Sequence, residues 1–198
     1  DLASTEPLGS FSYKETLGPV ELAAGDYQIR VTANGSTTAL YDSGTVALAS
    51  GKDLLVGAIP NTGDRDAPIA LGVYDGDSAT VVYDSNEGSK LRAVHNSQDA
   101  PNVDVFLDGS RAITNLAFPD AAPGADSYAD VDAGSLRVQI AQTGDAASNS
   151  VIDETLDLSN GQAYTVLATN TLANIEAQVL EDDNRSIATE ARLRVVHG

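Results

Sequence analysis

Cysteine, methionine and tryptophan are all absent from this 198-residue chain. Without cysteine the protein has no disulfide framework, no thiolate zinc site and no cysteine nucleophile. No apolar run approaches the roughly 18 residues that a membrane-spanning helix needs, so we expect no insertion into a membrane. An apolar content of 42% excludes a wholly disordered chain. The length suffices for one large domain or two small ones with hydrophobic cores of their own.

Positive charge is also scarce, with 11 Lys and Arg against 29 Asp and Glu and a net charge of −18. Only three of the cations are lysines, whereas 21 of the acidic residues are aspartates. Repulsion at this charge density is strong at low ionic strength, and molar salt removes most of it by shortening the Debye length to about 3 Å. This composition therefore predicts a protein of a salt-loving microbe, with an acidic secreted protein of ordinary habitat as the alternative. Both interpretations argue against nucleic acid or an anionic membrane as the partner.

Short strands separated by turns account for most of the sequence. Residues 27–32 and 136–140 alternate apolar and polar side chains with a period of two, as in strands with one buried face. Residues 53–59 and 164–168 are near-continuous apolar runs, which predict strands buried on both faces or central in a sheet. No segment keeps a helical period, and for residues 172–177 we favour a strand over a short helix. The pattern predicts an all-β fold of the sandwich or barrel type.

Internal repetition divides the chain into two similar parts. An Ala-Gly turn and an alternating strand occur at residues 22–31 and again at 131–140. A second shared segment lies at 46–56 and at 156–166, so the spacing stays near 110 residues. A repeat of this length predicts two tandem β-sandwich domains, at 1–89 and 90–190.

The phase of the repeat is unusual, because the opening strand of the second domain, Leu91–His95, has no counterpart before Leu8. A further copy of this strand stands instead at the C-terminus, within residues 191–198. We expect the first domain to keep an open sheet edge and this copy to act as a donor strand. It can fold back onto its own first domain, enter the next chain and build a head-to-tail filament, or open a further repeat of a longer array. The donor-strand residues are Arg192, Leu193, Arg194, Val195, Val196 and His197.

Residues 91–109 resemble the signature of a family of domains of unknown function, DUF4397. In that signature an Arg-Val-Val-His strand, a Ser-Pro-Asp-Ala-Pro turn and a Val-Asp-Val-Tyr-Val-Asp-Gly strand follow one another. Gln98 replaces the usual proline, and Ala93 and Phe106 are milder departures. The resemblance covers residues 91–190 and, as an incomplete copy, 8–90. It implies Ig-like modules of secreted or surface-attached microbial proteins, with no activity attached. The matching residues are Arg92, Val94, His95, Ser97, Asp99, Ala100, Pro101, Val103, Asp104, Val105, Asp108 and Gly109.

Clustered aspartates are candidates for calcium, which takes six to eight oxygen ligands. The best pair is Asp75 and Asp77 around a glycine, although pairs also arise by chance among 21 aspartates. Other candidates are Asp64 and Asp66, Asp130 and Asp132, and Asp182, Asp183 and Asn184.

Two sequons, at Asn34 and Asn184, are candidate glycosylation sites. Asn34-Gly35 is equally typical of a type I′ hairpin turn.

The only histidines, His95 and His197, occupy matched repeat positions. One histidine per module makes a poor zinc site, so we expect a strand-end histidine that forms a hydrogen bond across the adjacent Asp-Ala-Pro turn. No Gly-x-Ser-x-Gly elbow is present, and we predict neither a catalytic site nor a required cofactor.

The favoured function is a structural or adhesive protein outside the cell or on its surface, assembled as a homo-oligomer or filament by strand addition. The alternative is a carbohydrate- or calcium-binding module of a secreted or cell-surface protein, with a glycan as the partner.

Overall fold

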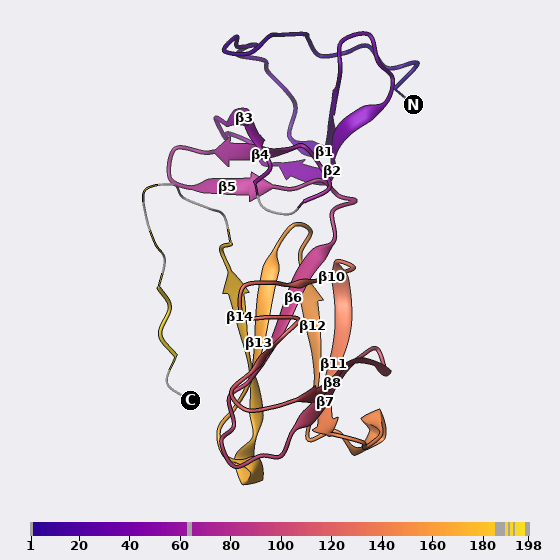
Figure 1. Ribbon diagram of the computed structural model, residues 1–198. Coiled ribbons are helices and arrows are strands. Elements are labelled where there is room, and N and C mark those ends of the chain that lie inside the picture. The colour runs from indigo at the N-terminus through magenta and orange to yellow at the C-terminus, as the bar shows by residue number, and fades with distance from the viewer. Residues whose placement is uncertain (1, 63–64, 185–188, 190, 192, 197–198) are drawn as a thin grey trace. The chain divides into compact units, whose positions relative to one another are not determined.

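The structure, a computed structural model, describes residues 2–62, 65–184, 189, 191 and 193–196 (Figure 1). Within these residues it contains strands, turns and two short 3-10 turns but no α-helix, which confirms the all-β prediction. The chain divides into a first unit, Asp1–Asn86, and a second unit, Glu87–Gly198.

The second unit is a sandwich of two sheets around one hydrophobic core. One sheet has the strand order β12-β11-β7-β8, and the other has the order β10-β6-β13-β14 with β9 also paired to β6. Core side chains come from both sheets, among them Leu91, Val138 and Val166. The strands are β6 (Ser89–His95), β7 (Val103–Leu107), β8 (Ser110–Leu116), β9 (Ala121–Ala122), β10 (Ala129–Val131), β11 (Gly134–Gln142), β12 (Ile152–Leu158), β13 (Ala163–Thr169) and β14 (Glu176–Asp182).

Local turn chemistry explains the hairpin between β7 and β8. Asp108 and Gly109 both have positive φ, 48° and 79°, as a two-residue type I′ turn requires. The prediction of a strand over residues 172–177 is only partly correct, because Leu172–Asn174 forms a 3-10 turn and β14 begins at Glu176.

The first unit contains two smaller sheets. Strands β1 (Gly25–Thr32) and β2 (Ala39–Leu48) form an antiparallel pair. Strands β3 (Leu55–Pro60), β4 (Ile69–Tyr74) and β5 (Ala79–Val82) form the second sheet in that order. The turn at Asn34-Gly35 is not type I′, since only Gly35 of the pair has positive φ, at 75°. The six residues between β1 and β2 are more than a two-residue hairpin turn contains.

The two units repeat the same strands with different burial. Aligning Gly25 with Gly134 and Gly51 with Gly161 makes β1, β2, β3 and β4 the counterparts of β11, β12, β13 and β14. Every residue of β13 is buried, because β6 and β14 flank it on both sides. In the sheet that the structure describes, β3 pairs only with β4, and four of its six residues are exposed. The prediction of a buried or central strand is therefore confirmed for 164–168 and wrong for 53–59.

Candidate functional site

The open edge of β3 is the first part of the candidate site. Val56 is 42% exposed, whereas its counterpart Val166 in β13 is 1% exposed. Ile29, in strand β1, is half-buried, whereas its counterpart Val138 is fully buried. The first unit therefore presents apolar side chains that the second unit covers with β6 and β7. Among its described residues, the first unit has no strand in either of those positions.

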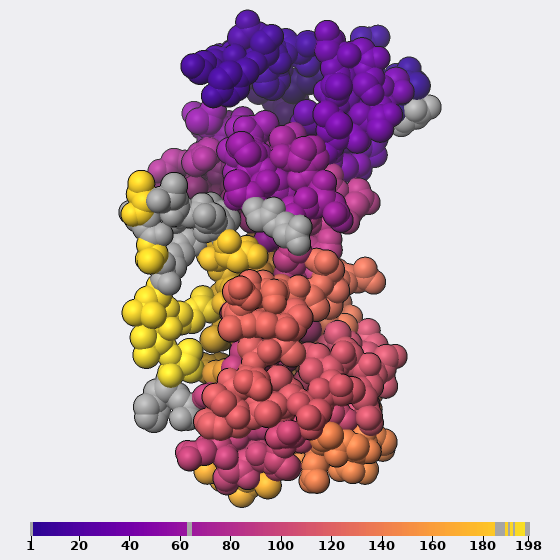
Figure 2. All heavy atoms as spheres, viewed as in Figure 1, coloured from indigo at the N-terminus to yellow at the C-terminus, as the bar shows by residue number. Residues whose placement is uncertain are grey.

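The C-terminal segment, residues 191–196, is the second part. Its apolar side chains stand in solvent, with Leu193 88% and Val195 82% exposed (Figure 2). Arg194 anchors it to the second unit by a 2.8 Å ion pair with Asp182 and a 2.6 Å hydrogen bond to the carbonyl oxygen of Glu181. Residues 193–196 are not in a strand. The predicted donor-strand residues Arg192 and His197 lie outside the described residues.

Strand β6 shows what this sequence does when it is paired. It runs parallel to β13, with Ala93 beside Val166 and Leu91 beside Tyr164. Leu91 and Ala93 point into the core and are buried. Their counterparts in the C-terminal segment are Leu193 and Val195. The segment therefore carries the apolar face of β6 without a core to bury it.

On the outer face of β6, Arg92 lies over the ring of Tyr128 at 4.6 Å and donates two hydrogen bonds to Thr165. Thr165 and Tyr128 both donate to Asp182, which also stands 3.6 Å from Arg92. Asp182 thus binds both Arg92 and its repeat counterpart Arg194. The sequence does not predict this cluster, because its residues come from five separate segments that meet only in the folded protein.

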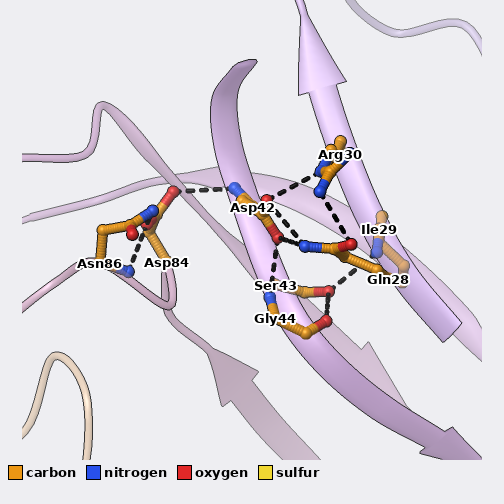
Figure 3. Close-up of polar contacts among 8 residues, drawn as sticks. All are labelled: Gln28, Ile29, Arg30, Asp42, Ser43, Gly44, Asp84 and Asn86. Carbon is orange, nitrogen blue, oxygen red and sulfur yellow. Dashed lines mark hydrogen bonds and ion pairs between the residues drawn. The ribbon is translucent and has the colours of Figure 1, made fainter. Parts of the chain in front are cut away.

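A second cluster that the sequence did not reveal holds the first unit together (Figure 3). The carboxylate of Asp42 accepts hydrogen bonds from Gln28, from Arg30 at 2.8 Å and from the backbone N–H of Gly44. Its own N–H donates to the carboxylate of Asp84 at 2.8 Å. Burial opposes ionisation, but these donors lower the pKa of Asp42 below its ordinary value. The cluster ties the β1–β2 pair to the segment after β5.

Tyr41, beside this cluster, is fully buried, and its hydroxyl donates to the carbonyl oxygen of Val82 at 3.0 Å. Burial, followed by the charges of Asp84 and Asp42, raises its pKa to about 12. It is a packing residue rather than an exposed phenol.

His95 has a structural environment. The ring is fully buried; Nε2 stands 3.0 Å from the carbonyl oxygen of Pro101, and Nδ1 accepts from the N–H of Ser97 at 3.3 Å. This arrangement requires the neutral tautomer with hydrogen on Nε2. The contact spans the turn, as the sequence predicted for a strand-end histidine, and leaves neither nitrogen available to a metal.

Asp104, in the middle of the family signature, is also structural. It lies opposite a β-bulge in β8, because two residues of β8, Thr114 and Asn115, face the single residue Asp104 of β7. Its carboxylate is buried and accepts from the N–H groups of Asn115 at 2.8 Å and Gly144 at 3.0 Å, with Arg111 at 3.1 Å. Burial opposes the charge, but these contacts lower the pKa of Asp104.

The candidate calcium pair lies in the turn between β4 and β5. One carboxylate oxygen of Asp75 accepts from Asp77 N–H and from the N–H and hydroxyl of Ser78, and the other pairs with Lys52 at 3.1 Å. These contacts hold the pKa of Asp75 well below its usual range. Both oxygens of Asp75 therefore stabilise a turn, and Asp77 is exposed.

Across the described residues, no group of three or more acidic or histidine side chains is placed to hold a metal. Of the other aspartate candidates, Asp130 pairs with Lys90 and Asp182 with Arg92 and Arg194, while Asp64 lies outside the described part. Calcium binding stays a prediction.

Both sequon asparagines are described. Asn34 is exposed in its turn, and Asn184 is half-buried just after β14. Glycosylation of either residue stays a prediction.

A shallow depression of about 380 Å³ lies in the second unit, lined by residues 113–117, 119–122 and 125. These are mostly small aliphatic residues, and Asp120 is their one carboxylate. A sugar site usually combines convergent polar groups with an aromatic ring for stacking, and no ring lines this depression.

The fold and these contacts define an acidic β-sandwich protein whose signature side chains serve turns, bulges and strand ends. The family model for a domain of unknown function, DUF4397, matches residues 89–198, so the chain belongs to that family. No curated protein matches the chain. In the part that the structure describes, no helix is long and apolar enough to cross a membrane.

Proposed function

We propose that this chain is a structural module of an extracellular or cell-surface protein, and that its C-terminal segment enters the first unit of a neighbouring copy as a donor strand. One match carries the proposal. β3 presents an open edge beside exposed apolar side chains, and residues 193–196 repeat β6, the strand that fills this edge in the second unit.

The repeat supplies the register of the added strand. Since Ala93 stands beside Val166 in the second unit, Val195 would stand beside Val56, parallel to β3. Leu193 and Val195 would then turn into the first unit, while Arg194 would face outward as Arg92 does. Strand addition satisfies the backbone groups of an open edge, and burying a leucine or valine side chain contributes about 1.5–3 kcal/mol.

The contacts of the family signature favour a structural role. His95, Asp104 and Asp108 have their side chains engaged with backbone groups of neighbouring segments. A catalytic or ligand-binding signature needs side chains that remain available to a substrate.

A donor strand and an acceptor edge at different places on one chain make a heterologous contact. Repeated between copies, such a contact gives an open filament unless the rotation closes a ring. Arg194 is held by Asp182 of its own second unit in the single chain, so donation requires exchange of this ion pair for contacts with the next copy. The rival is fold-back of the segment onto its own first unit.

The absence of cysteine makes disulfide mapping clean. One chain carries Val56→Cys and a second carries Val195→Cys; the two are mixed in molar salt and oxidised. Adjacent strands are about 4.8 Å apart, which falls within the Cα separation that a disulfide spans. We expect a cross-linked dimer of the two variants. The matched control is Thr80→Cys, in the same row of the sheet but on the opposite edge strand β5, and it should give little product.

If the mixture gives no dimer above the Thr80→Cys level, the donor-strand proposal is wrong. A chain carrying both Val56→Cys and Val195→Cys separates the rivals. Disulfides between chains support exchange, and an exclusively internal disulfide overturns it in favour of fold-back.

A further inference from the structure

Strand β6 has a neighbouring strand on each side. β6 is central in its sheet, with β13 parallel on one side and β10 antiparallel on the other. In the β10 pairing, Leu91 stands opposite Ala129, Lys90 opposite Asp130, and Ser89 opposite Val131.

The first unit contains the sequence counterpart of β10. Aligning the two Ala-Gly turns places residues 20–22 on residues 129–131. In the structure these three residues belong to no strand, and Val20 and Leu22 are about half exposed. They sit in a long stretch, residues 3–26, in which every side chain is exposed. The sequence therefore contains the counterpart of β10, and among the described residues no strand pairs with it.

Charge provides a second, independent correspondence. Lys90 of β6 and Asp130 of β10 form an ion pair at 2.7 Å. Their counterparts are Arg192 and Glu21, so both residue types differ but the signs are kept. Glu21 is exposed and forms no ion pair within the described residues. The chain has only 11 lysine and arginine residues, so we take the cation at this position as a specific feature of the repeated strand.

We infer that residues 20–22 are the second docking edge for the donor strand, which enters the first unit of a neighbouring copy as a central strand between this segment and β3. Ala191, Arg192 and Leu193 then pair antiparallel with Leu22, Glu21 and Val20, and the Arg192–Glu21 ion pair fixes the register. This inference rests on the proposed function and names both sides of its binding site.

The donor strand thereby also brings residues 20–22 of the neighbouring copy into a sheet. These residues gain a strand partner only when the donor is present, so their pairing with the donor forms together with the pairing between the donor and β3. Cooperation between the two edges makes the acceptor selective, since a strand that fits β3 alone leaves Glu21 without its cation.

Two cross-links separate this inference from the proposed function. A chain with Val20→Cys is mixed with one carrying Leu193→Cys, and in parallel Val56→Cys is mixed with Val195→Cys. We expect dimers from both mixtures, and little product when Leu17→Cys replaces Val20→Cys as a control for register. Dimers only from the β3 pair would overturn the second docking edge and leave the proposed function standing. Dimers from neither pair would overturn both.

A charge exchange tests the register with a readout independent of cysteine. Glu21→Arg should weaken assembly of the full chain at least fivefold, measured as the concentration at half-assembly. Arg192→Glu in the same chain should restore most of the loss by re-forming the pair with reversed signs. Glu6→Arg is the matched control for net charge, because Glu6 is an exposed carboxylate in the same N-terminal stretch. Equal effects of Glu21→Arg and Glu6→Arg, or no recovery in the double variant, would contradict the ion pair.

Discussion

Val56 and Val166 occupy the same position in the two units, yet Val56 is 42% exposed and Val166 is 1% exposed. The difference comes from their neighbours, because Val166 lies between β6 and β14 whereas Val56 has only β4 beside it in the described sheet. The unpaired backbone groups of an exposed apolar edge strand are a template for pairing with another strand. This relationship is the basis of the proposed assembly.

The thermal stability of the fold should depend on the salt concentration. With a net charge of −18, we expect the midpoint of thermal unfolding to fall on dialysis below roughly 0.1 M salt and to recover in molar salt, where screening is strong. Melts followed by circular dichroism over a series of NaCl concentrations measure this. A midpoint that does not move with salt would remove the support for a salt-loving source.

The sequence predicted the strands well because their signal is local. Alternation predicted β1 and β11. Burial of β3 was predicted wrongly, because an apolar run reports how well a strand fits a core and not whether its neighbours are present. The Asp42–Asp84 contact could not be predicted, since it joins residues from two segments through a backbone N–H. The Asp182 cluster could not be predicted either, because its side chains come from separate segments of the sequence.

Acid should destabilise the second unit through Asp104. Its folded-state pKa is lowered, so its stabilisation is complete above the ordinary aspartate pKa of about 3.9 and is lost as the pH falls through the depressed folded value. Asp104→Asn should lower the free energy of unfolding by about 2 kcal/mol at neutral pH, as expected for hydrogen bonds to a buried charge. It should also make the free energy of unfolding depend less on pH in the acid range. Denaturant melts between pH 2 and 7 measure both effects. Asp157→Asn, at an exposed carboxylate of the same unit, should change neither.

His95→Phe tests the structural assignment of the histidine. The substitution keeps an aromatic ring but leaves the Ser97 N–H and the Pro101 carbonyl oxygen without their partner. We expect a loss of roughly 2 kcal/mol in the free energy of unfolding of the second unit, typical of buried polar groups left unpaired. An unchanged denaturation midpoint would show that these contacts do not stabilise the turn.

Tyr41 should ionise late in an alkaline titration. Its raised pKa, about 12, means that the folded state resists ionisation: its contribution is complete below the ordinary tyrosine pKa of about 10 and is lost as the pH rises through 12. Ultraviolet absorbance of phenolate should therefore show a late-titrating fraction among the seven tyrosines. Tyr41→Phe should diminish that fraction. Absorbance that is complete by pH 11 in the folded protein would contradict the buried assignment.

Sedimentation of the intact chain beside a chain lacking residues 191–198 tests the donor strand most directly. In molar salt, we expect the 198-residue chain to form a concentration-dependent series of linear assemblies, whereas the shortened chain stays monomeric with a less stable first unit. A Val195→Asp variant places a charge on the core-facing side of the segment and should behave like the deletion, while Val196→Asp should retain more assembly. If the shortened chain assembles as the intact chain does and unfolds at the same midpoint, the donor-strand account is wrong.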